Sequence, residues 1–421
     1  MTVTDLDEDL AAALTDPASP AGAAGLRRAR AWLTRAAEPG SIALWRLVED
    51  AGPVAAVRAL RAGSAPEAVQ ALVGARAAED ATLADLRRAE RCGARLVVPE
   101  DDEWPALRLH ALTLAAHAGG GGERPTERPA DRTTALVPPV ALWVRGAAPL
   151  DATVDRSVAV VGARASTSYG EHVAADLGAQ LGERGWTVVS GGAYGIDVAA
   201  HRGALAAGAP TVAVLACGVD RAYPAAHSAV FERIVDGGGL LVSEWPPGAA
   251  PHRHRFLVRN RIIAGLTRGT VVVEAAARSG AQATARRAAG LGRAVLVVPG
   301  PVTSAMSVGC HELLREEDTG ARLVTGAAQV VEAVGDLGAD LAAPAERPAT
   351  PRDGLDDLAR RVLDACPVRV GVSAERLAAV AGCGPLEAMR VLPALEIAEL
   401  VQWTGTGWRL APARPPRQRA R

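Results

Sequence analysis

Three short segments of the sequence combine glycine, hydroxyl and arginine residues in patterns that suit anion binding. The first runs from Gly162 to Gly170, contains Arg164, and adds three hydroxyl side chains: Ser166, Thr167 and Ser168. It follows an apolar run and precedes a helical pattern, so free backbone N–H groups and a helix N-terminus would gather there and favour a phosphate. The guanidinium of Arg164 adds a forked donor. The spacing matches neither G-x-G-x-x-G nor a Walker A loop, and a polar turn without a ligand is the alternative.

The second segment also stands between an apolar run and a helical pattern. It begins Ser190-Gly191-Gly192-Ala193-Tyr194 and continues through Asp197 to His201. The glycines would let a ligand approach the backbone closely, which makes Ser190, Gly191, Gly192 and Tyr194 candidate contacts. Asp197 and His201 lie four residues apart, on one helical face. A metal pair would need a third ligand, which is not evident, so a structural Asp–His hydrogen bond is favoured and no metal is expected.

The third segment is basic. It runs from His252 to Arg261 and holds four Arg, two His and one of only two Phe residues in the chain. Cations for phosphates beside a ring for a base are what a single strand of nucleic acid requires. The candidate contacts are Arg255, Phe256, Arg259, Asn260 and Arg261. Two alternatives stay open: an ordinary solvated basic face, and a Phe256 that packs in the core under Ile262 and Ile263.

Residues 150–335 alternate short apolar runs with helical patterns. The runs are Val158–Val161, Thr187–Val189, Thr211–Leu215, Leu240–Val242, Thr270–Val273 and Ala294–Val298. Helical patterns lie at 171–183, 196–207, 225–236, 258–266, 281–290 and 307–316. This regular alternation predicts a parallel α/β sheet covered on both faces. All three segments would then lie at the carboxyl edge of the sheet, where such folds bind ligands.

The rest of the chain divides by composition. Residues 1–85 are expected to form a helical domain, in which two helices around Gly52-Pro53 resemble a helix-hairpin-helix (SAM-like) module, with a plain packing domain as the alternative. Residues 86–336 form the α/β domain, with a flexible insertion at 118–138. A linker at 337–353 precedes a predicted winged helix-turn-helix domain at 354–411 and a basic tail at 412–421.

Composition narrows the classes of function. The formal net charge is −1, so a nucleic-acid site must be a local patch, and all 46 basic residues are Arg because the chain has no Lys. Five scattered Cys without a C-x-x-C motif favour a reducing compartment. The acidic N-terminus lacks the basic region of a signal peptide, and no long apolar run predicts a membrane span. A cytoplasmic protein is therefore expected.

Several motifs together resemble the DprA (DNA-processing protein A, also called Smf) family. They include the segments above and Cys217-Gly218-Val219-Asp220, Ser243-Glu244-Trp245-Pro246, Val273-Glu274-Ala275, Ser279-Gly280 and Pro299-Gly300. The resemblance covers about residues 85–335. It implies an extended Rossmann-like fold, single-stranded DNA binding without a cofactor or catalysis, a homodimer, and delivery of the RecA recombinase during natural transformation. Leu257, Tyr194 and His227 depart from the family pattern.

Two other functions were weighed against DNA binding. A nucleotide or nucleotide-sugar hydrolase on a related Rossmann scaffold, like the lysine-decarboxylase-like enzymes, would carry a Pro-Gly-Gly-x-Gly-Thr-x-x-Glu loop, which Val298-Pro299-Gly300-Pro301 does not match. Glu244 and Glu274 are single acids at strand ends, for which a structural role is favoured over catalysis. A transcription factor would need a better reader than the third helix of the C-terminal domain, which offers only Arg390. A protein-contact role is favoured for that domain.

Overall fold

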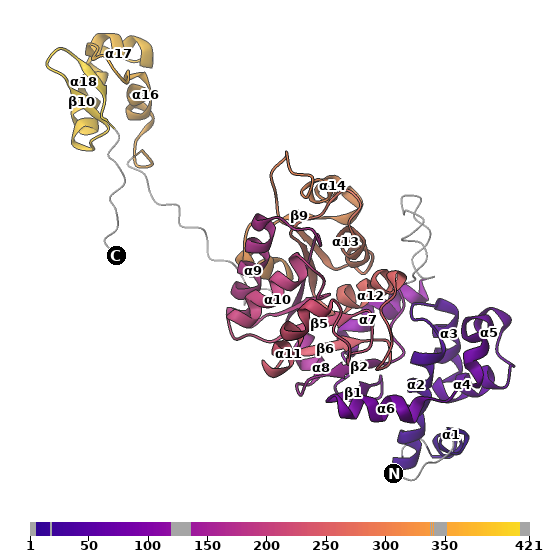
Figure 1. The fold of residues 1–421 in the computed structure, drawn as a ribbon. Helices are drawn as coiled ribbons and strands as arrows, with labels where there is room; N and C mark the ends of the chain where they lie inside the picture. The colour runs from indigo at the N-terminus through magenta and orange to yellow at the C-terminus, as the bar shows by residue number, and fades with distance from the viewer. Residues whose placement is uncertain are drawn as a thin grey trace. The chain divides into compact units, whose positions relative to one another are not determined.

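The protein consists of two compact units, residues 1–342 and 343–421 (Figure 1). The computed structural model describes residues 6–16, 19–118, 136–336, 338, 340 and 352–412. The insertion predicted at 118–138 and the linker predicted at 337–353 lie largely outside these residues, and so does nearly all of the tail predicted at 412–421. Within the described ranges no helix combines the length and the apolar character needed to cross a bilayer.

The first unit is built around one sheet of nine strands in the order β1-β2-β6-β5-β4-β3-β7-β8-β9. The strands are β1 (Ala94–Val97), β2 (Leu142–Arg145), β3 (Ser157–Val161), β4 (Thr187–Ser190), β5 (Thr211–Leu215), β6 (Leu240–Ser243), β7 (Gly269–Val272), β8 (Ala294–Val297) and β9 (Arg322–Leu323). From β6 to β9 every pair is parallel. The predicted Rossmann-like parallel sheet is therefore confirmed. Its β1 edge differs, because β1–β2 and β2–β6 are antiparallel.

The helices of this unit cover the sheet on both faces (Figure 1). They are α6 (Thr82–Arg91), α7 (Ala106–His117), α8 (Leu150–Asp155), α9 (Ser168–Glu183), α10 (Ile196–Ala206), α11 (Ser228–Asp236), α12 (Arg253–Leu266), α13 (Gly280–Gly290), α14 (Val308–Arg315) and α15 (Ala327–Val334). Three short 3₁₀ segments accompany them: Gly74–Ala78, Ala225–His227 and Glu317–Thr319. This is the two-sided cover that the uninterrupted apolar runs predicted.

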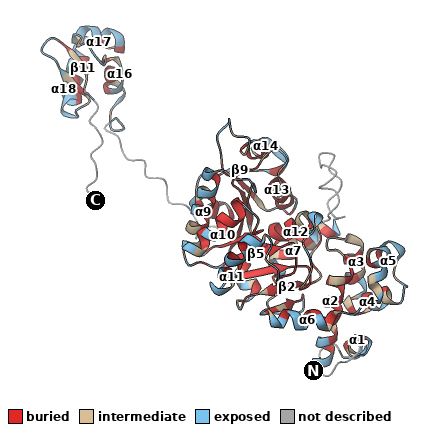
Figure 2. Ribbon diagram, in the orientation of Figure 1, coloured by how far each residue is buried: buried red, intermediate tan, exposed pale blue. Residues whose placement is uncertain are grey.

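The alternation of side chains within each strand explains the two layers. In β3, Ala159 and Val161 pack with α7, α8, α12, α13 and α14 in one core cluster. Val158 and Val160 point the other way and pack with α9, α10 and α15. Successive residues of a strand face opposite sides of the sheet, so a strand covered twice must be apolar at every position. Figure 2 shows the resulting buried interior, with exposed residues on the outer sides of the helices.

The N-terminal helices belong to the same compact unit as the sheet. They are α1 (Leu6–Thr15), α2 (Pro20–Ala36), α3 (Ile42–Ala51), α4 (Pro53–Arg61) and α5 (Glu67–Val73). Gly52 separates α3 from α4 at a φ of 78°, a left-handed conformation that suits glycine. The predicted helix pair around Gly52-Pro53 is thus confirmed as two helices. Its role as a helix-hairpin-helix module stays a prediction, as does the boundary of this domain at residue 85.

The C-terminal unit contains three helices and a hairpin. They are α16 (Asp357–Ala365), α17 (Ala374–Ala381), α18 (Pro385–Ile397), β10 (Val401–Trp403) and β11 (Trp408–Leu410). The two strands pair antiparallel and enclose a core with all three helices. This element content agrees with the predicted one, and the assignment as a winged helix stays a prediction.

The helices α9 and α10 pack so closely that glycine is required between them. A Cβ atom on Gly203 would lie 1.9 Å from the carbonyl oxygen of Ala175, and one on Gly178 would lie 2.3 Å from that of Ala200. Both contacts are with helix backbone, which cannot move aside independently. This contact holds together the two helices that begin at the first and second glycine-containing segments.

Gly203→Ala is therefore expected to lower the free energy of unfolding by about 1–3 kcal/mol, the usual cost of overpacking a tight contact. The loss should appear although Ala gains about 1 kcal/mol over Gly in helix propensity. Gly280→Ala, at the first position of α13 where a Cβ meets nothing within 4 Å, is the control and should be nearly neutral in urea unfolding. Equal stability of the two variants would contradict the close packing of α9 on α10.

Candidate nucleic-acid interface

Backbone hydrogen bonds tie the ends of three strands together at the carboxyl edge of the sheet. Ala163, just after β3, donates its N–H to the carbonyl of Glu274 after β7, at 2.7 Å. Its own carbonyl accepts from the N–H of Ile196, at the start of α10, at 3.2 Å. The approach requires a bare backbone at Gly195, where a Cβ would lie 2.3 Å from the Ala163 oxygen. The first and second segments are thus fixed side by side, as the sequence predicted.

Two of the three hydroxyl groups predicted as contacts in the first segment, those of Ser166 and Thr167, are engaged within the protein, and Ser168 is exposed. Thr167 caps α9 and accepts from the N–H of Gly170 at 3.2 Å. The buried carboxylate of Glu274 accepts from both the N–H and the hydroxyl of Thr167, at 2.9 and 2.6 Å. Ser166 donates to Glu171 at 2.8 Å. Arg164 remains exposed at the tip of the loop and is the group of this segment best placed to meet a phosphate.

Buried side chains support the second segment from below. The Ser190 hydroxyl donates to the carbonyl of Val160 at 2.6 Å and has no accessible surface. Asp197 accepts from the N–H of Ala193 at 3.3 Å, and burial raises the pKa of its carboxyl group. His201 pairs through Nδ1 with Thr211 at 2.8 Å, and burial lowers its pKa to about 3. The expected Asp197–His201 hydrogen bond is therefore wrong, because strand β5 supplies the partner of His201.

The third segment is helical over most of its length. It was expected to be a loop with a helical pattern from 258 onward, but α12 already begins at Arg253. Arg259 therefore lies on the buried face of the helix, where Nη1 donates to the carbonyls of Gly191 (2.9 Å) and Val214. Burial lowers the pKa of Arg259 to about 10. Asn260 is also buried and donates to the carbonyl of Gly280 at 3.3 Å.

Two other arginines of α12 form ion pairs. Arg261 has no accessible surface and pairs with Glu244, whose own carboxyl pKa is raised by burial. A contact between Arg261 and DNA would require this pair to open. Arg255 pairs with Glu38 of the N-terminal helical region at 2.5 Å, and Glu38 also accepts from the indole N–H of Trp245 at 3.0 Å. These arginines position α12, and their predicted contacts with DNA stay predictions.

Aromatic rings gather at the same edge. The Arg164 guanidinium lies 4.8 Å from the centre of the Phe256 ring, and the Tyr223 ring contacts Phe256 with ring centres 5.6 Å apart. Tyr194 is half exposed and contacts His227 at 4.7 Å. The chain has only three Tyr, and the third, Tyr169, is also exposed, at the start of α9. Phe256 is half-buried and packs against the buried cluster of Ala216, Trp245 and Val258, so the choice between a stacking role and a packing role stays a prediction.

A pocket of about 370 Å³ opens between these elements. Arg164, Phe256 and Arg259 line one part of it, and Arg278 and Ser279 line another, at the start of α13. Ser279 caps α13 by accepting from the N–H of Ala281 at 3.2 Å, so the positive end of this helix lies at the pocket. Among the predicted contacts, Gly162 and Asn260 also line it.

The structure adds four candidates that the sequence reasoning did not select: Arg278, Ser279, Tyr169 and Tyr223. Ser279-Gly280 was noticed as a family motif but not as a contact. The sequence could have indicated the tyrosines, because all three stand just after a predicted strand or at the start of a predicted helix. Exposed rings beside exposed arginines are the groups that stack on bases and pair with phosphates.

The sheet and this pocket define the chain as an open α/β protein with a pocket at the carboxyl edge of parallel strands, which is where such folds bind ligands. The family model for DNA recombination-mediator protein A matches residues 125–335. A Mycobacterium tuberculosis (strain H37Rv) relative named as a DNA processing protein DprA is 47% identical over 383 residues, which are 91% of this chain and 94% of the relative. The chain therefore belongs to the DNA recombination-mediator protein A (DprA/Smf) family.

Two further comparisons agree with this assignment. Protein Smf of Escherichia coli (strain K12) is 42% identical over 194 residues, which are 46% of this chain and 50% of Smf. The X-ray structure of DprA from Streptococcus pneumoniae superposes with a TM-score of 0.55 and 31% identity. That match covers 71% of this chain and 95% of the other, so the family resemblance inferred from sequence motifs is confirmed.

The buried Arg261–Glu244 pair gives a test of structural against DNA-contacting arginines. Arg261→Met leaves a buried carboxylate without its partner and is expected to cost about 3–5 kcal/mol of unfolding free energy. The double variant Arg261→Met/Glu244→Met removes both charges and should recover most of that loss in urea unfolding. An Arg261→Met protein that is as stable as the parent but binds DNA more weakly would instead place Arg261 in the interface.

Proposed function

We propose that this protein binds single-stranded DNA in the carboxyl-edge pocket, without catalysing a reaction, and acts as a recombination mediator. In this role it protects incoming DNA and loads the RecA recombinase during natural transformation. It is expected to act in the cytoplasm as a homodimer. The family description as a DNA recombination mediator supports the mediator role.

One observation carries the proposal: the exposed arginines Arg164 and Arg278 share one pocket with the half-buried ring of Phe256, which the exposed ring of Tyr223 contacts. Arg164 is stacked on Phe256, and Arg278 lies across the pocket beside the N-terminus of α13. Phosphates would meet the guanidinium groups and the helix end, and bases would stack on Phe256 and Tyr223. A duplex keeps its bases stacked on one another, so it could use only the charges.

The arrangement favours binding over the alternative of a nucleotide or nucleotide-sugar hydrolase. Asp197 is the one carboxylate among the described residues that line the pocket, and it is buried beside Arg259. Acid–base hydrolysis with two carboxylates would need a second acid there. Glu244 and Glu274 are occupied by Arg261 and Thr167 instead.

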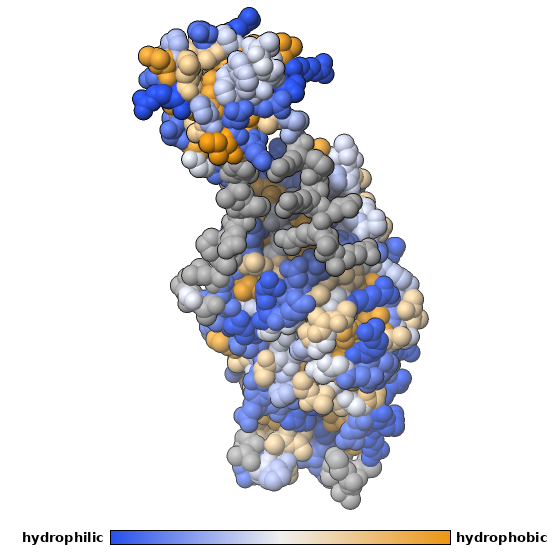
Figure 3. Space-filling view, turned by 90° about the vertical axis from the view of Figure 1, so that its left-hand side faces the viewer, coloured by the Kyte–Doolittle hydropathy of each residue, from blue (hydrophilic) through white to orange (hydrophobic). Residues whose placement is uncertain are grey.

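The C-terminal unit is proposed to contact protein rather than DNA. On α18, Leu386, Met389 and Ile397 are 77%, 56% and 86% exposed. Figure 3 shows hydrophobic side chains gathered on this unit. Arg390 is the only basic residue of the helix, which also carries Glu387 and Glu396. A helix that reads the major groove of DNA needs polar and basic side chains at these positions.

Arg164→Ala is expected to weaken the binding of an oligonucleotide by about 1.5–3 kcal/mol, because a charge-assisted contact is lost. Fluorescence anisotropy with single-stranded and duplex DNA at matched salt would measure this. The parent should prefer the single strand, with little dependence on base sequence. Arg202→Ala, an exposed arginine of α10 away from the pocket, is the matched control. Equal affinity of the parent for both forms of DNA would sink the proposal.

Stacking and charge should separate in the salt dependence. Phe256→Leu and Tyr223→Leu remove rings without charge, so affinity should fall by about 1–3 kcal/mol per lost stack while the slope of log K against log salt is unchanged. Arg164→Ala and Arg278→Ala should each reduce that slope by about 0.7. A Phe256→Leu protein that melts at a lower temperature but binds normally when folded would show that the ring only supports the fold.

A further inference from the structure

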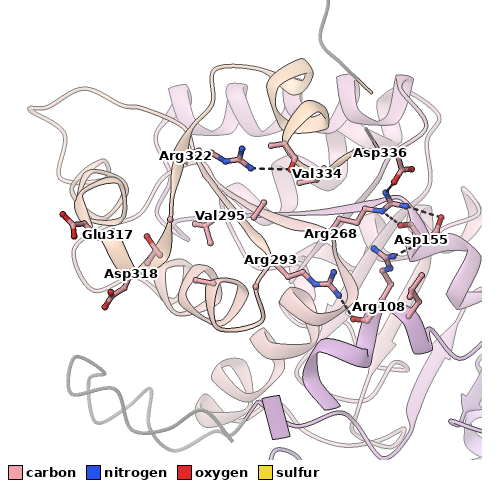
Figure 4. A pocket seen from close by; sticks show the side chains of 18 residues that line it. Arg108, Asp155, Arg268, Arg293, Val295, Glu317, Asp318, Arg322, Val334 and Asp336 are labelled. Atoms are coloured by element: carbon pink, nitrogen blue, oxygen red, sulfur yellow. Dashed lines mark hydrogen bonds and ion pairs between the residues drawn. The ribbon is translucent and has the colours of Figure 1, made fainter. Parts of the chain in front are cut away.

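A second, larger pocket lies at the opposite edge of the sheet. It has a volume of about 870 Å³ and is bordered by the amino ends of β8 and β9 and by the residues just before β3 and β7. Figure 4 shows the guanidinium groups of Arg108, Arg268 and Arg293 gathered toward one end, and Glu317 and Asp318 at the other. Among the described residues, none lines both this pocket and the carboxyl-edge pocket.

Two arginines of this pocket, Arg268 and Arg322, donate to carbonyl groups at or near the ends of helices. Arg268 donates to the carbonyl of Asp155 at the end of α8 (2.9 Å) and pairs with the carboxylate of Asp336 at 2.8 Å. Arg322 reaches the carbonyl of Ala333 near the end of α15 at 3.5 Å. The negative ends of helices meet at this edge of an α/β sheet, and these two cations offset them.

Arg108 and Arg293 are not accounted for in this way. The Arg108 side chain is 12% exposed, and its nearest carboxylate among the described residues is that of Asp155 at 3.8 Å. The Nε atoms of Arg108 and Arg293 are both buried without a hydrogen-bond partner in this part of the chain. Arg293 donates through Nη2 to the carbonyl of Arg108 at 2.8 Å, and no described carboxylate forms an ion pair with it.

The pKa shifts of Arg108 and Arg293 also indicate that their charges are not fully compensated within the protein. Burial lowers the pKa of Arg108 and of Arg293, and the neighbouring guanidinium charges lower both further. Asp155 and Asp336 raise the pKa of Arg108 without cancelling this effect. Two like charges held together with buried donors are an unfavourable arrangement unless an anion joins them.

We propose that Arg108 and Arg293 form a binding site for a small phosphate-bearing anion at the amino edge of the sheet, separate from the DNA site. A tetrahedral dianion offers several acceptor oxygens, which suits forked guanidinium donors. None of the described residues that line the pocket is aromatic, so they would recognise the phosphate group and offer no stacking surface for a base.

Binding can be measured on the full chain with inorganic phosphate and with AMP, at constant ionic strength. Both should bind in calorimetry and raise the melting temperature, because a ligand that prefers the folded state stabilises it. Arg108→Gln and Arg293→Gln should each weaken both ligands about tenfold or more. Arg202→Gln, which removes the same charge from a remote exposed site, should bind like the parent.

The melting temperature of each variant without phosphate shows whether the variant is folded. Gln is used because its side chain keeps part of the aliphatic chain of Arg, which limits the loss of packing contacts. Measuring both ligands on both variants distinguishes the two pockets. Arg293→Gln should keep the affinity of the parent for single-stranded DNA, and Arg164→Ala should keep its affinity for phosphate. The proposal is overturned if Arg164→Ala abolishes phosphate binding while Arg293→Gln preserves it. It is also overturned if phosphate leaves the melting temperature of the parent unchanged.

Discussion

The geometry of the carboxyl edge depends on the backbone of one small residue, Ala163. Its N–H and its carbonyl join the ends of β3 and β7 to the start of α10. Such a seam forms only where no side chain intervenes, which is why Gly162 and Gly195 flank it on the two segments; a Cβ at Gly162 would lie 2.5 Å from Ile196. The loop that carries Arg164 is thereby fixed against the loop that carries Tyr194, and this contact shapes one side of the pocket.

Buried charged side chains of α12 lie beneath the backbone hydrogen bonds of Ala163. Arg259 fills the space beneath Gly191, where a Cβ would lie 2.4 Å from the guanidinium, and Arg261 pairs with Glu244 deeper in the protein. Buried cations are costly unless they are paired or hydrogen bonded, so these side chains restrict α12 to one position. The exposed arginines, Arg164 and Arg278, are the ones proposed to contact DNA. The arginines around the pocket therefore fall into two groups: buried ones that support the fold, and exposed ones for which binding is proposed.

Much of this fold could be predicted from the sequence, because strands buried on both faces leave uninterrupted apolar runs and glycine-rich segments mark their ends. Six predicted runs became β3–β8. The basic segment was harder to interpret. Arginine is rarely buried, so nothing in its spacing told Arg259 and Arg261 apart from exposed residues, and His252 caps α12 without a side-chain hydrogen bond that would mark its start. The partner of His201 lies on another strand, and Arg108 and Arg293 are 185 residues apart, so only the fold brings these pairs together.

The contact between Glu38 and Arg255 has a consequence for communication within the molecule. Burial alone would raise the pKa of Glu38, but hydrogen bonds from Arg255 and Trp245 outweigh it and lower the pKa, so the carboxylate holds the N-terminal helices against α12 in its charged form. The same α12 carries Phe256 into the pocket. A molecule that bound the N-terminal helices and displaced them relative to α12 would therefore act on the helix that carries Phe256. If it changed the affinity of the pocket for its ligand by some factor, thermodynamic linkage would require that occupancy of the pocket change the affinity for that molecule by the same factor.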